Sequence, residues 1–196
     1  MNIFFLHHNQ IKCARWHCDK HVVKMILETA QLLYTAHWYV AIDKGQLPSF
    51  KTAPQHTSGR MRGYLPITNH KHPSALWARA SIQHYKWLAL FGLALCNEYR
   101  HRFNDKKHSC ESHLRWLYLN QPPIEDLGWK DPTQAMPDEY KSANSIVAYR
   151  KYYRESKTRL LTYTKTTDDT QACSQNTSSS SNHFKAAWRL PAGSVR

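Results

Sequence analysis

Three side chains near the start of the sequence have the types and spacing needed for chemistry on a sugar. Glu28 is a carboxylate with Lys24 four residues before it and His21 seven residues before it, so all three share one face of a helix. A lone carboxylate among cations can stabilise positive charge that develops on a sugar ring, or take a proton from it. The alternative is a solvated helix face with an ordinary Lys–Glu pair, which contributes only roughly 0.2–0.5 kcal/mol.

Histidine and cysteine residues in the same region permit a second interpretation, which is metal binding. Cys13, His17, Cys18 and His21 lie close together, and His17, His21 and His70 are the ligands that a metal-dependent nuclease would use. However, the sequence lacks the two spaced ligand pairs of a zinc finger and the motifs of zinc proteases and deaminases. We therefore expect no metal and no other cofactor.

The charge of the chain indicates a polyanionic partner. Among 196 residues, 27 Lys and Arg outnumber 14 Asp and Glu, which gives a formal charge of +13 at pH 7. Such an excess repels itself unless a polyanion neutralises it. Because no apolar run approaches the roughly 18 residues of a membrane-spanning helix, we expect double-stranded DNA and not a membrane as the partner. An odd number of cysteines, five, favours a reducing, cytoplasmic setting.

Apolar periodicity predicts an all-α fold: a single compact helical domain over residues 1–165 and a low-complexity tail over residues 166–196. Asp19 suits the N-cap of the first long helix, and we expect a monomer. The helices are expected at 19–38, from Pro73 to about Phe103, from Ser109 or Ser112 to about Leu119, and over 145–161. In the tail, we expect Thr166–Asn182 to be disordered and His183–Leu190 to dock back onto the domain.

The segment from Lys44 to Pro73 is predicted to be a long basic loop, rich in Pro and Gly. A loop of this length within a compact domain is usually functional. Its cations would neutralise phosphates, and Gly59 and Gly63 would let the backbone approach them closely. The residues expected to contact DNA are Lys20 on the first helix, Lys51, Arg60, Arg62, Asn69, His70, Lys71 and His72 in the loop, and Arg150 and Arg154 on the last helix.

The order of these motifs resembles a known enzyme family over Asn2–Lys165. Asp19-Lys20-His21, with Glu28 nine residues after the aspartate, resembles the pyrimidine-dimer DNA glycosylases, which are small phage-type glycosylase and abasic-site lyase enzymes. The run from Asn69 to Pro73 is similar to an Asn-His-Pro stretch of related sequences, with two residues inserted. The run from Ser145 to Arg150 is similar to the C-terminal helix of the family.

The resemblance implies an all-α enzyme that bends duplex DNA and extrudes a nucleotide from the base stack. In that family the N-terminal α-amine attacks C1′ of the sugar to form a Schiff base. Carried over, Glu28 would stabilise the charged sugar and promote strand elimination, and His21 would hold the site or a phosphate. Asn2 is a poor context for removal of Met1, so the amine would be that of Met1, or Lys24 would supply it, or Glu28 would activate water instead.

The identity of the excised base stays open, because the family has Arg beside the catalytic glutamate and one turn later, where this chain has Leu27 and Gln31. We expect a DNA N-glycosylase for a damaged or modified pyrimidine, with or without lyase activity. It would act in DNA repair or in defence against modified viral DNA. The rival interpretations are a non-catalytic DNA-binding protein and the metal-dependent nuclease.

Overall fold

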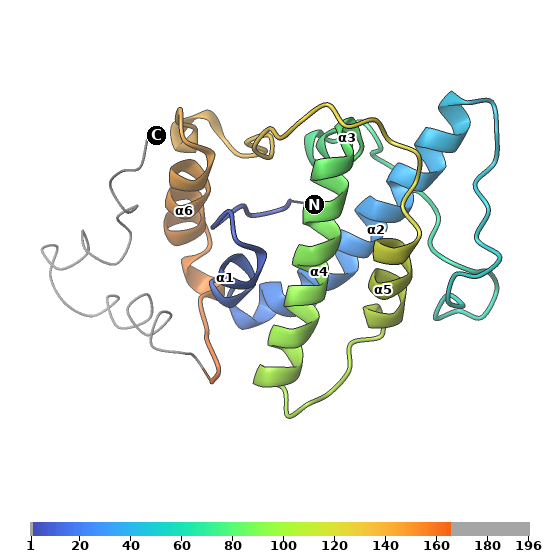
Figure 1. The fold of residues 1–196 in the computed structure, drawn as a ribbon. Helices are drawn as coiled ribbons and strands as arrows, with labels where there is room; N and C mark the ends of the chain where they lie inside the picture. The colour runs from blue at the N-terminus through green and yellow to red at the C-terminus, as the bar shows by residue number, and fades with distance from the viewer. Residues whose placement is uncertain (1, 166–196) are drawn as a thin grey trace, which may run out of the picture.

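Six α-helices and two short 3-10 helices form the part of the chain that the computed structural model describes, residues 2–165 (Figure 1). Within these residues, the only strand-like pairing is an isolated bridge between Gln55 and Arg62. The expected compact all-α fold is therefore confirmed, whereas the predictions for 166–196 lie outside the described residues. The helices are α1 (Gln10–Arg15), α2 (Asp19–Asp43), α3 (Pro73–Ala80), α4 (Ile82–Arg102), α5 (Glu111–Leu119) and α6 (Ser145–Ser156), with η1 (Asp138–Tyr140) and η2 (Thr158–Leu160).

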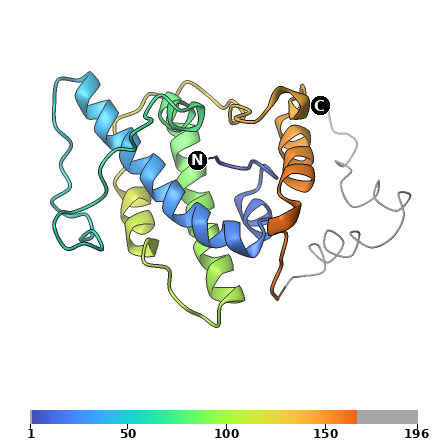
Figure 2. The ribbon, with the colours of Figure 1, turned by 180° about the vertical axis from the view of Figure 1, so that it is seen from behind.

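The two longest helices, α2 and α4, cross at the centre of the molecule. α4 lies in front of α2 in Figure 1, and the reverse view in Figure 2 shows α2 in front, with α6 and the loop after α2 at opposite sides. Gly92 of α4 allows the close approach of its neighbours. A Cβ there would lie 2.8 Å from Cδ2 of Leu114 in α5 and 2.9 Å from Cγ2 of Thr29 in α2. A larger residue at this position would require the side chains of Leu114 and Thr29 to shift.

The N-terminal segment runs through the interior and not over the surface. The four apolar side chains of residues 3–6 are each at most 6% exposed, so the hydrophobic effect fixes the segment in the core. Trp87 of α4 donates from Nε1 to the carbonyl oxygen of His8 at 2.7 Å. At the other end, Asn2 donates from Nδ2 to the carbonyl oxygen of Ala135 at 2.8 Å. Residues 2–8 are thereby fixed to α4 and to the segment that contains Ala135.

The predicted helix from Pro73 to Phe103 is wrong in one respect, because Ser81 divides it into α3 and α4. Ser81 has extended backbone angles, φ −153° and ψ 147°. Its hydroxyl accepts the backbone N–H groups of Gln83, at 3.3 Å, and Leu127, at 3.2 Å. A serine that caps the second helix and also binds a distant segment overrides the apolar periodicity that runs through it.

Three other predicted helix boundaries differ from the structure. α2 continues to Asp43, and Asp19 is its first residue, while Cys18 occupies the N-cap position. Asp19 instead binds Arg102, whose Nη1 lies 3.0 Å from Oδ1, and the N–H and hydroxyl of Thr164. α6 ends at Ser156, and the predicted continuation is the separate turn η2.

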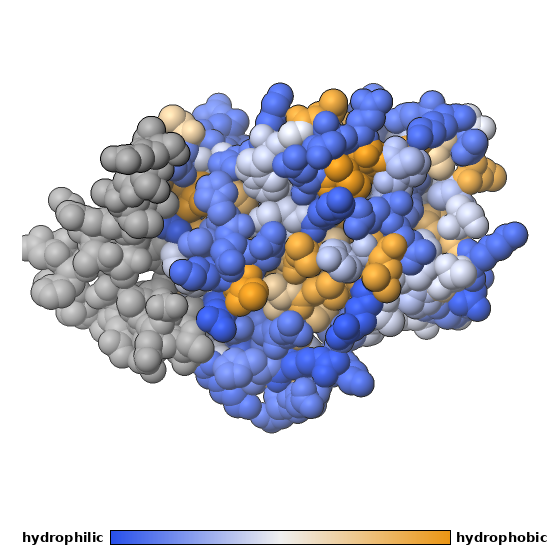
Figure 3. All heavy atoms as spheres, in the orientation of Figure 1, coloured by the Kyte–Doolittle hydropathy of each residue, from blue (hydrophilic) through white to orange (hydrophobic). Residues whose placement is uncertain are grey.

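The surface is mainly hydrophilic on the α4 side of the molecule, where hydrophobic side chains occur in separate patches (Figure 3). The predicted loop between α2 and α3 contains no helix, as expected. Within residues 2–165, no helix is both long and apolar enough to cross a membrane.

Candidate functional site

Glu28 does not lie on a solvated helix face, because only 8% of the residue is exposed. Its Oε2 accepts a hydrogen bond from the backbone N–H of Asn2 at 3.3 Å, and its Oε1 lies 3.3 Å from Nζ of Lys24. The carboxylate borders a cavity of about 330 Å³, which Phe4, His21, Met25, Ala135, Tyr152, Lys157 and Leu160 also line. A carboxylate at this depth, with two nitrogens directed at it, differs from the ordinary surface pair.

His21 lines the same cavity and is neutral. Burial, with smaller contributions from Lys157 and Lys24, lowers the pKa of His21 to about 4. Its Nδ1 lies 2.7 Å from the hydroxyl of Tyr153, which also accepts the backbone N–H of Cys18 at 2.8 Å. The hydroxyl of Tyr153 therefore joins the imidazole of His21 to the start of α2 and fixes the orientation of the ring.

The backbone at the cavity is strained. Phe4, which stacks on the His21 ring at a centroid distance of 4.7 Å, has φ 47°. That left-handed conformation is rare for an aromatic residue and costs about 1–3 kcal/mol. The side-chain oxygen of Asn2 accepts the N–H groups of Ile3, at 2.8 Å, and Phe4, at 3.3 Å. Asn2 therefore stabilises the turn that brings its own nitrogen to Glu28.

Three residues of the cavity were not predicted from the sequence: Ala135, Tyr152 and Lys157. They follow Glu28 by more than 100 residues and carry no motif of their own. The ammonium group of Lys157 lies 4.7 Å from the Tyr152 ring centroid, so the cavity has a second cation besides Lys24. The only signal in the sequence was the density of Tyr and Lys/Arg in the last helix.

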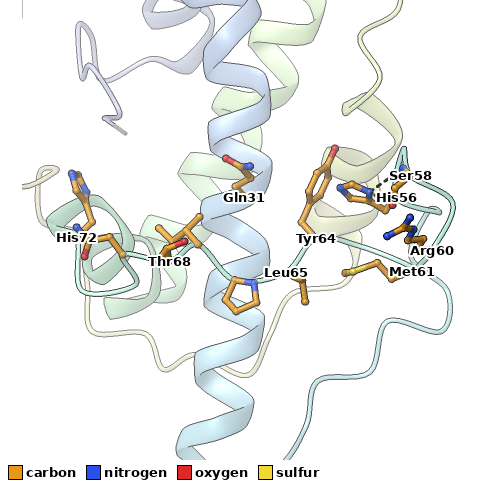
Figure 4. Close-up of a pocket in the computed structure, with 12 residues that line it drawn as sticks. Gln31, His56, Ser58, Arg60, Met61, Tyr64, Leu65, Thr68 and His72 are labelled. Atoms are coloured by element: carbon orange, nitrogen blue, oxygen red, sulfur yellow. Dashed lines mark hydrogen bonds between the residues drawn. The ribbon is translucent and has the colours of Figure 1, made fainter.

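A larger hollow of about 720 Å³ lies along the same helix. Gln31 of α2 lines it together with residues of the loop between α2 and α3 and His72. Figure 4 shows Gln31 between Tyr64 and His56 on one side and Thr68 and His72 on the other. Arg60 and Asn69, both predicted to contact DNA, also border this hollow and are exposed.

The other predicted DNA contacts in the loop and on α2 are mostly on the surface. Lys20, Lys51, Arg62 and Lys71 are exposed. Arg62 donates from Nη1 to the carbonyl oxygen of Ala53 at 2.8 Å, so part of its guanidinium maintains the loop. The remaining cations are available to phosphates.

His70 and His72 are half-buried and have structural contacts. The ring of His70 stacks on Tyr39 at a centroid distance of 4.3 Å. Nδ1 of His72 accepts the N–H of Ser74 at 3.1 Å, which caps α3. Burial lowers the pKa of His72, an effect that the carboxylate of Glu28 opposes. His72 is therefore within electrostatic range of Glu28.

The prediction that Arg150 binds DNA is not supported by its position. The residue is 5% exposed, donates from Nε to the carbonyl oxygen of Leu6 at 2.9 Å, and stacks over Trp16 at 4.3 Å. Burial lowers its pKa to about 10. Its guanidinium connects α6 to the N-terminal segment. Arg154, on the same helix, is half-buried.

The three histidines of the nuclease interpretation have other partners. His17 is fully buried in the core, and its Nδ1 lies 2.7 Å from the carbonyl oxygen of Cys13. Burial lowers its pKa to about 3. No group of three or more His, Cys, Asp or Glu side chains with the arrangement of a metal site occurs in residues 2–165.

The predicted catalytic residue Met1 lies outside the described residues.

Comparison with protein-family models, curated proteins and solved structures finds no significant match to this chain.

Proposed function

We propose that this chain is a DNA N-glycosylase that removes a damaged or modified pyrimidine base from duplex DNA. The observation that carries the proposal is the buried carboxylate of Glu28, which lies between the backbone nitrogen of Asn2 and the ammonium group of Lys24. The adjoining cavity of about 330 Å³ gives a sugar access to the carboxylate, and it falls in the range of roughly 300–1,000 Å³ that is typical of small-molecule sites.

Glu28 acts on the charge that develops when the glycosidic bond breaks. As the C1′–N bond breaks, its electron pair leaves with the base and positive charge accumulates on the sugar. A carboxylate in a site of low dielectric stabilises that charge strongly, because little water screens the interaction. The nucleophile forms the new bond to C1′, and Glu28 accepts the proton that the nucleophile loses.

The nucleophile is water or an amine beside Glu28. If Asn2 were the first residue of the mature chain, its nitrogen, 3.3 Å from the carboxylate, would be the α-amine. An α-amine has a pKa near 8, so roughly a tenth of it is neutral at pH 7. Lys24 is the less suitable amine, because its side chain is 67% exposed and ion-paired with Glu28. Attack by an amine gives a Schiff base, from which removal of a C2′ proton expels the 3′ phosphate.

The surrounding cations support duplex DNA as the substrate. Lys20 and Lys24 are exposed on α2, and Arg60 and Lys71 are exposed on the loop that borders the larger hollow. Contacts of this kind position the duplex without reading its sequence. The extruded nucleotide then enters the cavity at Glu28.

The experiment that tests the proposal compares the chain with Glu28→Gln on ultraviolet-irradiated and hypermodified duplexes. Alkali-cleavable sites are measured, since abasic sites break in alkali. The expected result is cleavage by the unmodified chain, a reduction of about 10²–10⁴-fold in Glu28→Gln, and no change in Glu155→Gln, an exposed control on α6. Equal DNA binding with no cleavage in every case would instead favour the non-catalytic DNA-binding protein.

A further inference from the structure

The larger hollow and the Glu28 cavity are adjacent along α2. Gln31 lines the larger hollow and follows Glu28 by one helical turn, so the two side chains are neighbours on the helix surface. His72 lines it too, and its pKa responds to the Glu28 carboxylate. A nucleotide whose sugar reaches Glu28 therefore has the larger hollow beside its base.

The wall of the larger hollow is fixed to α2 and is not a loose loop. The carbonyl oxygen of Tyr64 accepts a hydrogen bond from Nε1 of Trp38 at 3.0 Å, and the N–H of Ile67 donates to Oγ1 of Thr35 at 3.0 Å. Gly63 has φ 68°, and a Cβ there would lie 2.7 Å from an aromatic ring on α2. Only glycine permits this close contact, so the hollow is formed before a ligand arrives.

The size of the hollow exceeds what a single pyrimidine ring requires. Its volume of about 720 Å³ lies in the upper part of the range of roughly 300–1,000 Å³ that buries drug-sized ligands. The Glu28 cavity, at about 330 Å³, is less than half as large. Space of this size beside the base suits a base that carries a large substituent.

The lining of the hollow indicates the chemistry of that substituent. The lining is mixed, because the apolar side chains of Met61, Leu65, Pro66 and Ile67 form much of it. Hydroxyl and amide groups come from Ser58, Thr68, Gln31 and Asn69, and Arg60 supplies a positive charge. The described residues that line it include no Asp or Glu. Amides and hydroxyls both donate and accept hydrogen bonds, so they can bind a polar substituent that offers donors or acceptors. A cationic substituent would be repelled by Arg60, and no carboxylate among the described lining residues would balance its charge.

We propose that the larger hollow receives a pyrimidine with a bulky, polar and non-cationic substituent, and that such hypermodified bases are the substrates of this chain. This inference rests on the proposed function and specifies its substrate class. Bases with small substituents leave the hollow largely filled with water. They gain few of its contacts, and they are released slowly.

The test measures cleavage of the C1′–N bond by the unmodified chain, counted as alkali-cleavable sites in matched duplexes. Each duplex contains one pyrimidine whose substituent is a methyl group, an alkylamine or a neutral polyhydroxylated group, and a fourth contains an ultraviolet dimer. The expected result is release of the polyhydroxylated base at least about tenfold faster than the others. Release of the methyl, alkylamine or dimer base at an equal or higher rate would overturn the substrate class and leave the glycosylase intact. Release from no duplex would overturn both proposals.

A pocket-filling variant tests the location of the substituent. Leu65, which lines the hollow and is 62% exposed, is replaced by Trp. Leu127→Trp is the matched control, since Leu127 is 67% exposed and does not line the hollow. Leu65→Trp should slow release of the polyhydroxylated base about tenfold or more and leave both the affinity for unmodified DNA and the circular dichroism unchanged. Equal release by the two Trp variants would show that the substituent binds elsewhere.

Discussion

The backbone nitrogen of Asn2 lies 3.3 Å from Oε2 of Glu28, although 26 positions separate the two residues. The contact depends on the buried segment of residues 3–6 and on the left-handed turn at Phe4. Strain of this kind persists only where the surrounding structure compensates for it. The structure thus brings the backbone nitrogen of Asn2 to a buried carboxylate.

A Schiff base, if it forms, should involve the N-terminal amine and not Lys24. We predict that borohydride traps a covalent complex with a substrate duplex, and that Lys24→Met retains at least about half of the trapped product, because Lys24 is 67% exposed and ion-paired with Glu28. Peptide mapping of the trapped complex identifies the modified nitrogen. An adduct on Lys24, or complete loss of trapping in Lys24→Met, would assign the nucleophile to the lysine.

Arg60 and Lys71 should contact phosphates. We predict that Arg60→Ala and Lys71→Ala each reduce the slope of log affinity against log salt by about 1, because each contact with phosphate releases roughly one counterion. Lys86→Ala is the control, since Lys86 is exposed on α4 and lines neither cavity. Titration of a labelled duplex at several salt concentrations provides the slopes. An effect of Lys86→Ala equal to the other two would indicate diffuse attraction without a defined interface.

Arg150 should matter for stability and not for DNA binding. Removing its guanidinium leaves the carbonyl oxygen of Leu6 without its donor in a buried position. We predict that Arg150→Gln lowers the free energy of unfolding by about 2–3 kcal/mol, whereas Arg159→Gln, at an exposed position, changes it by less than about 0.5 kcal/mol. Urea denaturation measures both. If Arg150→Gln left the free energy of unfolding unchanged and reduced the salt slope of DNA binding, the result would support the phosphate contact that the sequence predicts.

Stability should decrease as the pH falls from about 6.5 to 4, because buried histidines stay neutral in the folded state. The pKa of His21 is lowered to about 4 and that of His17 to about 3, from 6.5. Within this window the unfolded chain binds protons that the folded chain does not, so the free energy of unfolding rises with pH. Each histidine contributes up to about 1.4 kcal/mol per pH unit. Urea midpoints between pH 4.5 and 7.5 measure the slope, which His21→Asn should reduce; a flat profile would contradict neutral histidines.

The helical fold was predictable because apolar residues that recur at helical spacing form one face of a helix, and that face is buried in the core. In α2, residues 22, 25, 26, 30, 33 and 34 lie at helical spacing in the sequence, and all six are buried. The break at Ser81 was not predictable, because the deciding partner is the N–H of Leu127, far along the chain. Local patterns do not record which distant backbone group a serine will bind.

The candidate site was predictable only in part. The spacing of His21, Lys24 and Glu28 along one helix placed them together correctly. Helical geometry alone cannot say whether such a face is solvated, however, and here Asn2 and Phe4 cover it. For Arg150, the sequence predicted a solvent-exposed residue that contacts phosphate, because the last helix is basic. In the structure the residue is buried, and its guanidinium donates to the carbonyl oxygen of Leu6.

Mass analysis of the bases released from a panel of modified duplexes tests most directly whether Glu28 promotes cleavage of a glycosidic bond. We predict a free modified pyrimidine in the presence of the unmodified chain, and at least about 100-fold less with Glu28→Gln. DNA affinity should be equal or higher in that variant, because a negative charge is lost. Detection of no free base with any duplex, or equal release by Glu28→Gln, would contradict this role of Glu28.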